Sequence, residues 1–157
     1  MTAMFGELRD LYQEVILDHG RKPRNFRRLD NATLTARGDN PMCGDRMELF
    51  LAMDRGVIAE ASFQGRGCAI SIASGSLMTE TIKGRTPDEA RALGEAFRGL
   101  ARTGVCPVCE GALAEAMERL TPLSGVHEFP SRVKCATLAW HTLNAALDGG
   151  GKEASSE

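Results

Sequence analysis

Residues 46–64 read RMELFLAMDRGVIAEASFQ and predict an antiparallel β-hairpin. The first half, residues 46–53, alternates apolar and polar side chains, which is typical of a strand that buries one face of a sheet. Asp54-Arg55-Gly56 is compatible with a tight turn, and residues 57–64 predict the returning strand. A shorter strand is predicted over residues 32–37. We therefore expect a sheet of three antiparallel strands.

Helical patterns surround these strands. Helices are predicted over residues 4–18, 69–83, 87–98 and 111–120, and from Pro130 to the glycines at 149–151. Gly20 and Gly84 are expected to end the first two helices. Thr86-Pro87-Asp88-Glu89 is a capping box with proline at the first helical position. Helix, antiparallel strands and further helices make an α+β fold, for which we expect one domain over residues 1–148 and a disordered tail over 149–157.

The composition indicates a globular protein and excludes several functions. The chain has 157 residues, 43% of them hydrophobic and 25% charged, which suffices for one buried core. A formal net charge of −2 gives no overall positive potential that would attract nucleic acid. The basic connector 21–28 has no aromatic residue other than Phe26 on which bases could stack. No apolar run is long enough to span a membrane, and the acidic start does not resemble a signal peptide. We expect a cytoplasmic protein that binds neither nucleic acid nor membrane.

The cysteines carry the chemical information. They are Cys43, Cys68, Cys106, Cys109 and Cys135. Five thiols cannot all pair within one chain, and cytosolic cysteines more often bind metal or carry out thiol chemistry than form structural disulfides. A hairpin turn centred on Arg55 would place residue 67 opposite Cys43, so that Cys43 and Cys68 meet at one end of the sheet, within a residue if the strand carries a bulge.

Two further residues complete a candidate ligand set. Asp45 follows Cys43 by two residues in the turn-forming segment NPMCGD. Cys68 precedes a predicted helix, whose N-terminal amides favour a thiolate. Cys135 lies in the first turns of the last helix, close to Arg132 and Lys134, which also favour a thiolate. Three thiolates and a carboxylate suit zinc, and thiolates also hold iron–sulfur clusters. An exposed carboxylate exchanges more readily than a thiolate, which favours a site that opens. Alternatively, the three cysteines are small buried hydrophobic residues.

Three segments around these cysteines resemble the cysteine motifs of the IscU/SufU family. They are NPMCGD at 40–45, FQGRGCAIS at 63–71 and FPSRVKCATLAW at 129–140. The segment from Leu11-Tyr12 to His19 and the following KPRN are similar too. The resemblance covers about residues 7–147 and implies a NifU-like α+β sandwich, with a three-stranded antiparallel sheet covered by helices, and a role in iron–sulfur cluster biogenesis.

Departures from IscU resemble the SufU branch. IscU scaffolds carry a histidine before the third cysteine, where this chain has Lys134, and a chaperone-binding Leu-Pro-Pro-Val-Lys segment, where it has Phe129-Pro-Ser-Arg-Val. The stretch between Cys68 and Cys135 also holds an extra helix and loop. The SufU resemblance implies that Cys43, Asp45, Cys68 and Cys135 bind zinc. It further implies that Cys43 accepts persulfide sulfur from a SufS-type cysteine desulfurase, whose histidine displaces it from zinc. Apo iron–sulfur proteins or a downstream Suf scaffold would receive the sulfur.

Three functions stay open at this point. Lys134 and the longer middle segment favour a sulfurtransferase-like, zinc-dependent sulfur acceptor. The alternative is a scaffold that assembles a transient [2Fe–2S] cluster on Cys43, Cys68 and Cys135 and then transfers it. A purely structural zinc domain is disfavoured by Asp45, because closed structural sites usually use cysteine or histidine.

Other reactive residues have weaker patterns. Cys106 and Cys109 form a C-x-x-C pair, for which we expect either a reversible disulfide clip or inert loop cysteines. His19, His127 and His141 are weak ligand candidates. Arg132 is expected either to face a partner or the thiolates, or to be a solvated residue of the first helical turn.

Overall fold

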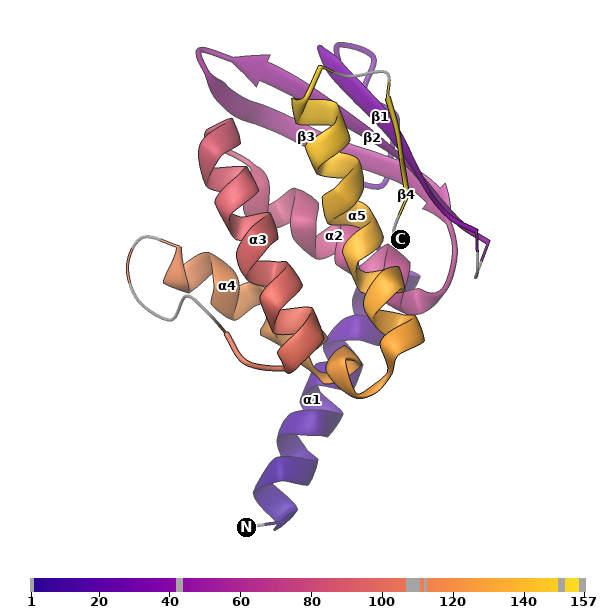
Figure 1. The fold of residues 1–157 in the computed structure, drawn as a ribbon, viewed down its shortest axis with the longest axis vertical. Helices are drawn as coiled ribbons and strands as arrows, with labels where there is room; N and C mark the ends of the chain where they lie inside the picture. Colours follow the sequence, from indigo (N-terminus) through magenta and orange to yellow (C-terminus); the bar gives the residue numbers. More distant parts are fainter. Residues whose placement is uncertain (1, 42–43, 107–110, 112, 150–151, 156–157) are drawn as a thin grey trace.

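The computed structural model packs helices against one face of a sheet (Figure 1). It describes residues 2–41, 44–106, 111, 113–149 and 152–155, of which 2–11 and 152–155 are described by their backbone alone. In chain order the elements are α1 (Thr2–Arg21), β1 (Leu34–Asn40), β2 (Asp45–Asp54), β3 (Val57–Arg66), α2 (Ala69–Ile82), α3 (Pro87–Thr103), α4 (Ala114–Leu120), the 3-10 helix η1 (Thr121–Glu128), α5 (Pro130–Leu147) and β4 (Lys152–Ser155). The predicted single-domain α+β fold with three antiparallel strands is confirmed.

The register of the hairpin differs from the prediction. Asp54 pairs with Val57, so the turn has two central residues, Arg55 and Gly56, whose φ angles of 53° and 80° suit a tight hairpin turn. A bulge between Ala52 and Met53 shifts the pairing once more. Arg46 therefore pairs with Arg66, whereas a turn centred on Arg55 would pair it with residue 64. The register at this end of the hairpin therefore differs from the predicted one by two residues, and Cys43, for which the prediction was made, lies outside the described residues.

The core lies between the sheet and the helices α2, α3 and α5. Leu49 and Phe63 project from paired positions of β2 and β3 and are fully buried. Helix α2 approaches the sheet closely at Gly75, where an added Cβ would lie 2.9 Å from both Met47 Cε and Phe63 Cε2. On the far side of the core, the rings of Phe97 and Trp140 stack with centroids 5.4 Å apart. These contacts hold α2 and α5 in place relative to the sheet, and both helices begin near the same end of it.

Several element ends differ from the sequence prediction. Helix α1 continues through Gly20 to Arg21, and Gly20 instead allows a close contact, since its added Cβ would lie 3.1 Å from Ala69 Cβ. Residues Thr121–Glu128, for which no element was predicted, form η1. In place of a tail disordered from residue 149, Lys152–Ser155 pairs in parallel with β1 as β4. The edge of β1 that does not face β2 has unpaired backbone N–H and C=O groups, which can pair with a further strand. The polar composition of residues 149–157 gives no sign of this pairing, because it depends on the position of β1 in the fold.

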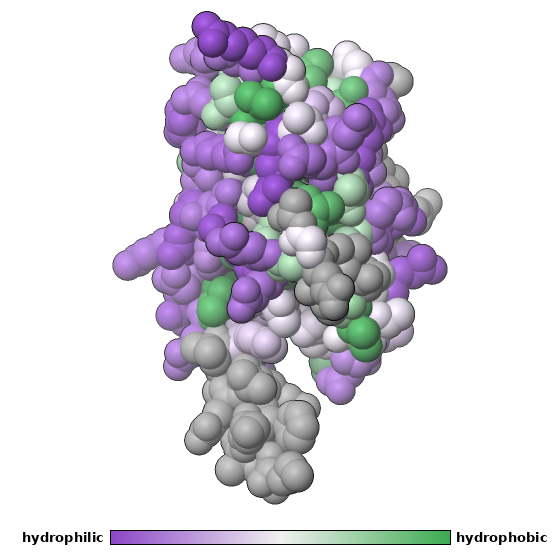
Figure 2. All heavy atoms as spheres, turned by 90° about the vertical axis from the view of Figure 1, so that its left-hand side faces the viewer, coloured by the Kyte–Doolittle hydropathy of each residue, from purple (hydrophilic) through white to green (hydrophobic). Residues whose placement is uncertain are grey.

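On the side shown in Figure 2, the coloured hydrophobic side chains form small separate groups among hydrophilic ones. Within the described ranges, none of the helices is both long enough and apolar enough to cross a bilayer.

Gly38 of β1 marks a tight contact with α5. An added Cβ would overlap Thr142 Oγ1 and lie 3.1 Å from Leu138 Cδ1. Thr142 is fully buried and its hydroxyl donates to the carbonyl of Leu138 at 2.8 Å, so it cannot move away freely. We expect Gly38→Ala to lower the free energy of unfolding by about 1–3 kcal/mol, measured by urea denaturation.

The control is Gly125→Ala, because an added Cβ at Gly125 has nothing within 4 Å. Its free energy of unfolding should stay within about 0.5 kcal/mol of wild type. Adding Thr142→Ala to Gly38→Ala should recover part of the lost stability. Wild-type stability of Gly38→Ala would contradict the described packing of β1 on α5.

Candidate metal centre

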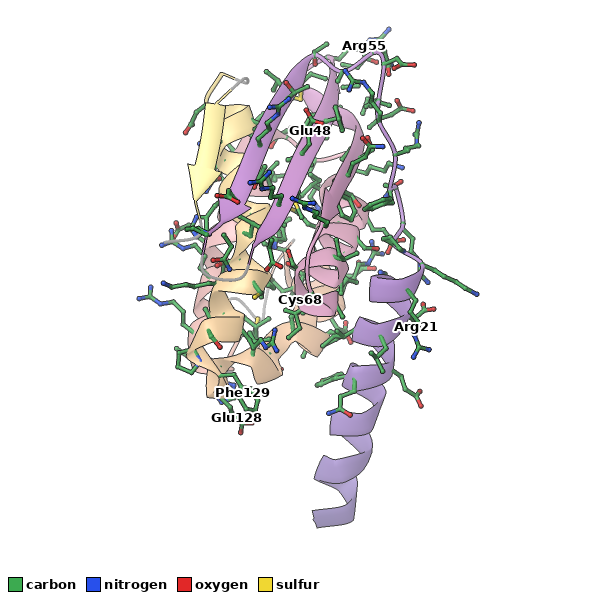
Figure 3. All side chains as sticks on the ribbon, turned by 90° about the vertical axis from the view of Figure 1, so that its right-hand side faces the viewer. Arg21, Glu48, Arg55, Cys68, Glu128 and Phe129 are labelled. Atoms are coloured by element: carbon green, nitrogen blue, oxygen red, sulfur yellow. The ribbon has the colours of Figure 1, made fainter. Side chains whose placement is uncertain are left out.

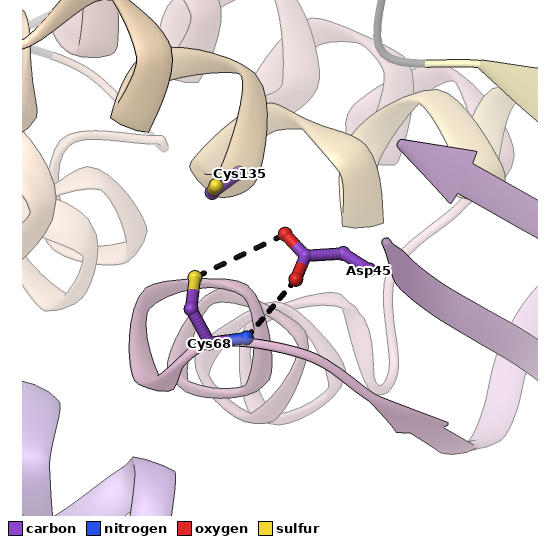
Figure 4. Close-up of side chains that lie close together, drawn as sticks. All are labelled: Asp45, Cys68 and Cys135. Carbon is purple, nitrogen blue, oxygen red and sulfur yellow. Dashed lines mark hydrogen bonds between the residues drawn. The ribbon is translucent and has the colours of Figure 1, made fainter. Parts of the chain in front are cut away.

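Three potential metal ligands meet where the sheet ends and α2 and α5 begin. Asp45 is the first residue of β2, Cys68 is the N-cap of α2, and Cys135 lies in the second turn of α5. One ligand atom from each lies within 4.8 Å of the others (Figure 4). The structure thus brings together three of the four predicted ligands from distant parts of the chain. The fourth, Cys43, lies outside the described residues.

Cys68 is positioned by the start of α2. It has extended backbone angles, φ −70° and ψ 165°, and its Sγ accepts a hydrogen bond from the amide of Ser71 at 3.5 Å. A sulfur at this position faces the unpaired amides and the positive end of the helix dipole, which stabilise a negative charge. The predicted placement of Cys68 at a helix N-terminus is confirmed.

Asp45 is buried, with 1% of its surface exposed, whereas an exposed carboxylate was predicted. Its Oδ1 accepts a hydrogen bond from the Cys68 amide at 3.0 Å, and its Oδ2 lies 3.9 Å from Cys68 Sγ. The carboxylate packs over Gly67, where an added Cβ would overlap Oδ1. The sequence could not show this burial, because it depends on the hairpin register and on the missing side chain at Gly67. A buried carboxylate requires hydrogen bonds or a cation.

Cys135 is completely buried on α5. The amide Nδ2 of Asn40 lies 3.9 Å from its Sγ, and the carbonyl oxygen of Ser131 lies 3.6 Å from the same sulfur. The guanidinium of Arg132 lies beside both sulfurs, and negative charge on Cys68, then hydrogen bonding and charge at Cys135, raise the pKa of Arg132. Arg132 is exposed, yet it offsets the negative charge of the centre.

The donor set fits a tetrahedral metal ion. Bond lengths of about 2.0 Å to oxygen and 2.3 Å to sulfur place two ligands of one zinc roughly 3.5–3.8 Å apart. The 3.9 Å between Asp45 Oδ2 and Cys68 Sγ is close to that separation. Thiol and carboxylate donors suit zinc, and thiols also suit iron–sulfur clusters. Asp45, Cys68 and Cys135 would hold the metal, and the loop that contains Cys43 begins and ends at Asn40 and Asp45, which are paired in register.

The other predicted candidates lie elsewhere. Among the described residues, the group with metal-ligand spacing contains no histidine. His127 Nδ1 lies 2.7 Å from the Ser124 carbonyl, and His141 is half-buried on α5, where burial lowers its pKa. Cys106 is half-buried and packs against the edge of the core, while Cys109 lies outside the described residues.

His19 connects α1 to α2 and does not belong to the group of potential metal ligands. Its Nδ1 lies 2.7 Å from Ser76 Oγ, which also accepts a hydrogen bond from the Arg24 amide at 2.8 Å. Burial, followed by the positive charge of Arg24, lowers the pKa of His19.

The stability of the fold should therefore fall on acidification. Below a pH of about 6.5 the histidine of the unfolded chain takes up a proton before His19 of the folded chain does, so protons favour unfolding. We expect His19→Gln to be less stable than wild type at pH 8, and to lose less stability between pH 7 and pH 5. His141, whose pKa is also lowered, leaves a residual slope. Denaturant unfolding across this range measures the effect; equal slopes in both proteins would contradict it.

An apolar groove of about 680 Å³ includes in its lining Ile70, which follows Cys68 by two residues in the chain. Its lining includes Ile16 of α1, Ile70 of α2 and Phe129, which is 58% exposed and immediately precedes α5. Figure 3 shows Cys68 near the middle of the molecule and Phe129 below it, away from the Arg55 turn of the sheet. The centre therefore lies beside a surface with exposed hydrophobic side chains.

Comparisons with known proteins identify the family of this chain. A family model described as NifU-like N terminal domain matches residues 11–136. The zinc-dependent sulfurtransferase SufU of Bacillus subtilis (strain 168) is 36% identical over 137 residues, which cover 87% of this chain and 89% of that protein. The iron–sulfur cluster assembly scaffold protein IscU of Thermotoga maritima is 38% identical over 137 residues, which cover 87% and 92%.

Solved structures show the same fold. The crystal structure of a putative iron–sulfur cluster assembly scaffold protein for the SUF system from Fervidobacterium islandicum AW-1 superposes with a TM-score of 0.75 and 32% identity, covering 85% of this chain and 94% of that one. The family model spans most of the chain, and both relatives exceed 30% identity over most of it. This chain therefore belongs to the NifU-like N-terminal domain family, the SufU and IscU proteins of iron–sulfur cluster assembly.

Proposed function

We propose that this protein is a zinc-dependent acceptor of persulfide sulfur in iron–sulfur cluster assembly. Zinc would be held by Cys43, Asp45, Cys68 and Cys135, and Cys43 would accept the sulfur. The observation that carries the proposal is the buried carboxylate of Asp45 within 4.8 Å of two cysteine sulfurs. The name of the Bacillus subtilis relative, a zinc-dependent sulfurtransferase, supports the same function.

The reaction needs an ionised thiol. The Cys43 thiolate attacks the terminal sulfur of a persulfide on the donor enzyme, a new S–S bond forms on Cys43, and the donor cysteine leaves as a thiolate that takes up a proton. Zinc, when bound, keeps the thiols deprotonated and out of side reactions. The chain itself contributes the positive charge of Arg132 and the amides at the start of α2, which offset the negative charge of Cys68 and Cys135.

The sulfur donor would be a cysteine desulfurase of the SufS type. The surface beside the centre is suited to such a protein, because Phe129 is 58% exposed and a groove lined by apolar side chains adjoins it. The acceptors downstream would be apo iron–sulfur proteins or a further Suf scaffold.

A second candidate is a scaffold on which a [2Fe–2S] cluster is assembled. Relatives from Thermotoga maritima and Streptococcus pyogenes, named iron–sulfur cluster assembly scaffold proteins, are 38% and 37% identical to this chain, as similar as the sulfurtransferase. Two thiols and a carboxylate at this spacing accept iron as well as zinc. Lys134, where the scaffold type has histidine, favours the sulfur acceptor.

Elemental analysis and a desulfurase assay on one anaerobic sample separate these functions. We expect about one zinc per chain and faster release of sulfur by a SufS-type enzyme when the protein is added. Iron and sulfide without zinc would establish the scaffold instead. Zinc without any stimulation would indicate a structural zinc domain, and neither metal nor stimulation would refute both proposals.

A further inference from the structure

Asn40 is a buried polar residue for which the sequence motif alone suggests no role. It ends β1, is 1% exposed, and pairs in register with Asp45. Its carbonyl accepts a hydrogen bond from the Gly44 amide at 2.8 Å, which closes the loop between the two strands. The end of β1 and the start of β2 are paired, and they thus place both the Asn40 side chain and the Asp45 carboxylate at the centre.

The side chain of Asn40 reaches Cys135. Its Nδ2 lies 3.9 Å from the Cys135 sulfur, although the two residues are 95 positions apart in the sequence. Both residues are buried, so water does not compete with this contact. An amide N–H that donates to a thiolate stabilises its negative charge and orients the sulfur. A donated hydrogen bond also withdraws electron density, which makes the sulfur a weaker nucleophile.

We propose that Asn40 is a positioning residue that holds Cys135 as a metal ligand and keeps it from reacting as a sulfur nucleophile. The proposal rests on the proposed function in naming Cys135 a ligand, but the contact exists without metal. This role of Asn40 would explain why, of the three cysteines of the proposed site, Cys43 accepts sulfur and Cys135 does not. Cys135 is completely buried and receives the Asn40 amide, and Cys68 receives the Ser71 amide at 3.5 Å.

The chemistry of the amide predicts which replacements fail. Aspartate has nearly the same shape as asparagine, but an ionised carboxylate only accepts hydrogen bonds and would repel both the Cys135 thiolate and Asp45. Serine keeps a small donor that is too short to reach the sulfur. Outer-shell partners of metal ligands typically contribute about 10–100-fold to metal affinity. Asn40→Asp should therefore weaken zinc binding by about 10–100-fold, and Asn40→Ser by less.

Two measurements on the full-length protein test the proposal. Competition with a chelator gives zinc affinity, and brief treatment with iodoacetamide followed by peptide mass mapping gives the alkylation rate of each cysteine. We expect Cys135 to be modified several-fold faster in Asn40→Ser than in wild type. Asn40→Asp is assessed by zinc affinity alone, because its added negative charge also disfavours the Cys135 thiolate that iodoacetamide attacks. Cys106, half-buried at another part of the core, is the internal reference, because general destabilisation would raise its rate as well. Asn31→Asp, an exposed position, is the matched control.

The alkylation is repeated on metal-free protein, which separates this proposal from that of zinc binding. If wild type holds no zinc, faster and selective modification of Cys135 in Asn40→Ser still supports the role of Asn40. An unchanged Cys135 rate in Asn40→Ser, or Cys135 and Cys106 rates that rise together, would overturn it.

Discussion

Replacement of Cys43 by alanine is expected to abolish acceptance of sulfur from a cysteine desulfurase. Asp45, Cys68 and Cys135 already occupy the centre, and two of them are almost completely buried. The amides of Asn40 and Ser71 donate to the sulfurs of Cys135 and Cys68. Cys135 is completely buried, Cys68 is half-buried, and an amide hydrogen bond weakens each sulfur as a nucleophile, so we expect neither cysteine to replace Cys43 in the transfer.

The measurement is transfer of labelled sulfur to the protein, followed by mass mapping of the modified cysteine. We expect a persulfide on Cys43 in wild type and none on any cysteine in Cys43→Ala. The double variant Cys106→Ser, Cys109→Ser is the control and should retain both zinc and sulfur acceptance. Undiminished transfer to Cys43→Ala would assign the acceptor role to another cysteine, and loss of zinc in the control would overturn the ligand assignment.

Gly67→Ala is expected to remove most of the metal-binding capacity without changing any ligand. The added Cβ would overlap Asp45 Oδ1 and lie 2.8 Å from Asp45 Cγ. The carboxylate must then turn away from the Cys68 amide and from the other donors, which it now meets within 4.8 Å. Loss of one oriented ligand should weaken zinc binding by at least tenfold, by analogy with outer-shell substitutions that cost about 10–100-fold.

Chelator competition measures this change. The rise in melting temperature on addition of zinc should shrink in parallel, since an ion that binds the folded protein more weakly stabilises it less. Gly125→Ala, whose added Cβ meets nothing within 4 Å, is the control for a glycine-to-alanine change and should bind zinc as wild type does. Wild-type zinc affinity in Gly67→Ala would show that Asp45 does not need its described position to support the metal.

Local patterns were sufficient for most of the secondary structure. The alternation in residues 46–53 and the capping box at Thr86 act over a few residues, and the structure contains the corresponding β2 and α3. Register was not available from these patterns, because the bulge at Ala52/Met53 depends on how the hairpin packs against the helices. The same limit applies to β4, which exists only where β1 offers a free edge.

The sequence by itself determined the α+β class, the elements that carry Asp45, Cys68 and Cys135, and the choice of donor atoms, since residue type and helix position fix these locally. The tertiary structure alone decided that Asp45 is buried, that Gly67 makes room for it, and that Asn40 reaches Cys135 across 95 residues. Such contacts arise from the packing of α2 and α5 against the sheet end. The spacing of these residues along the chain does not predict such contacts, because each contact depends on every helix and strand that holds the two contacting residues in place.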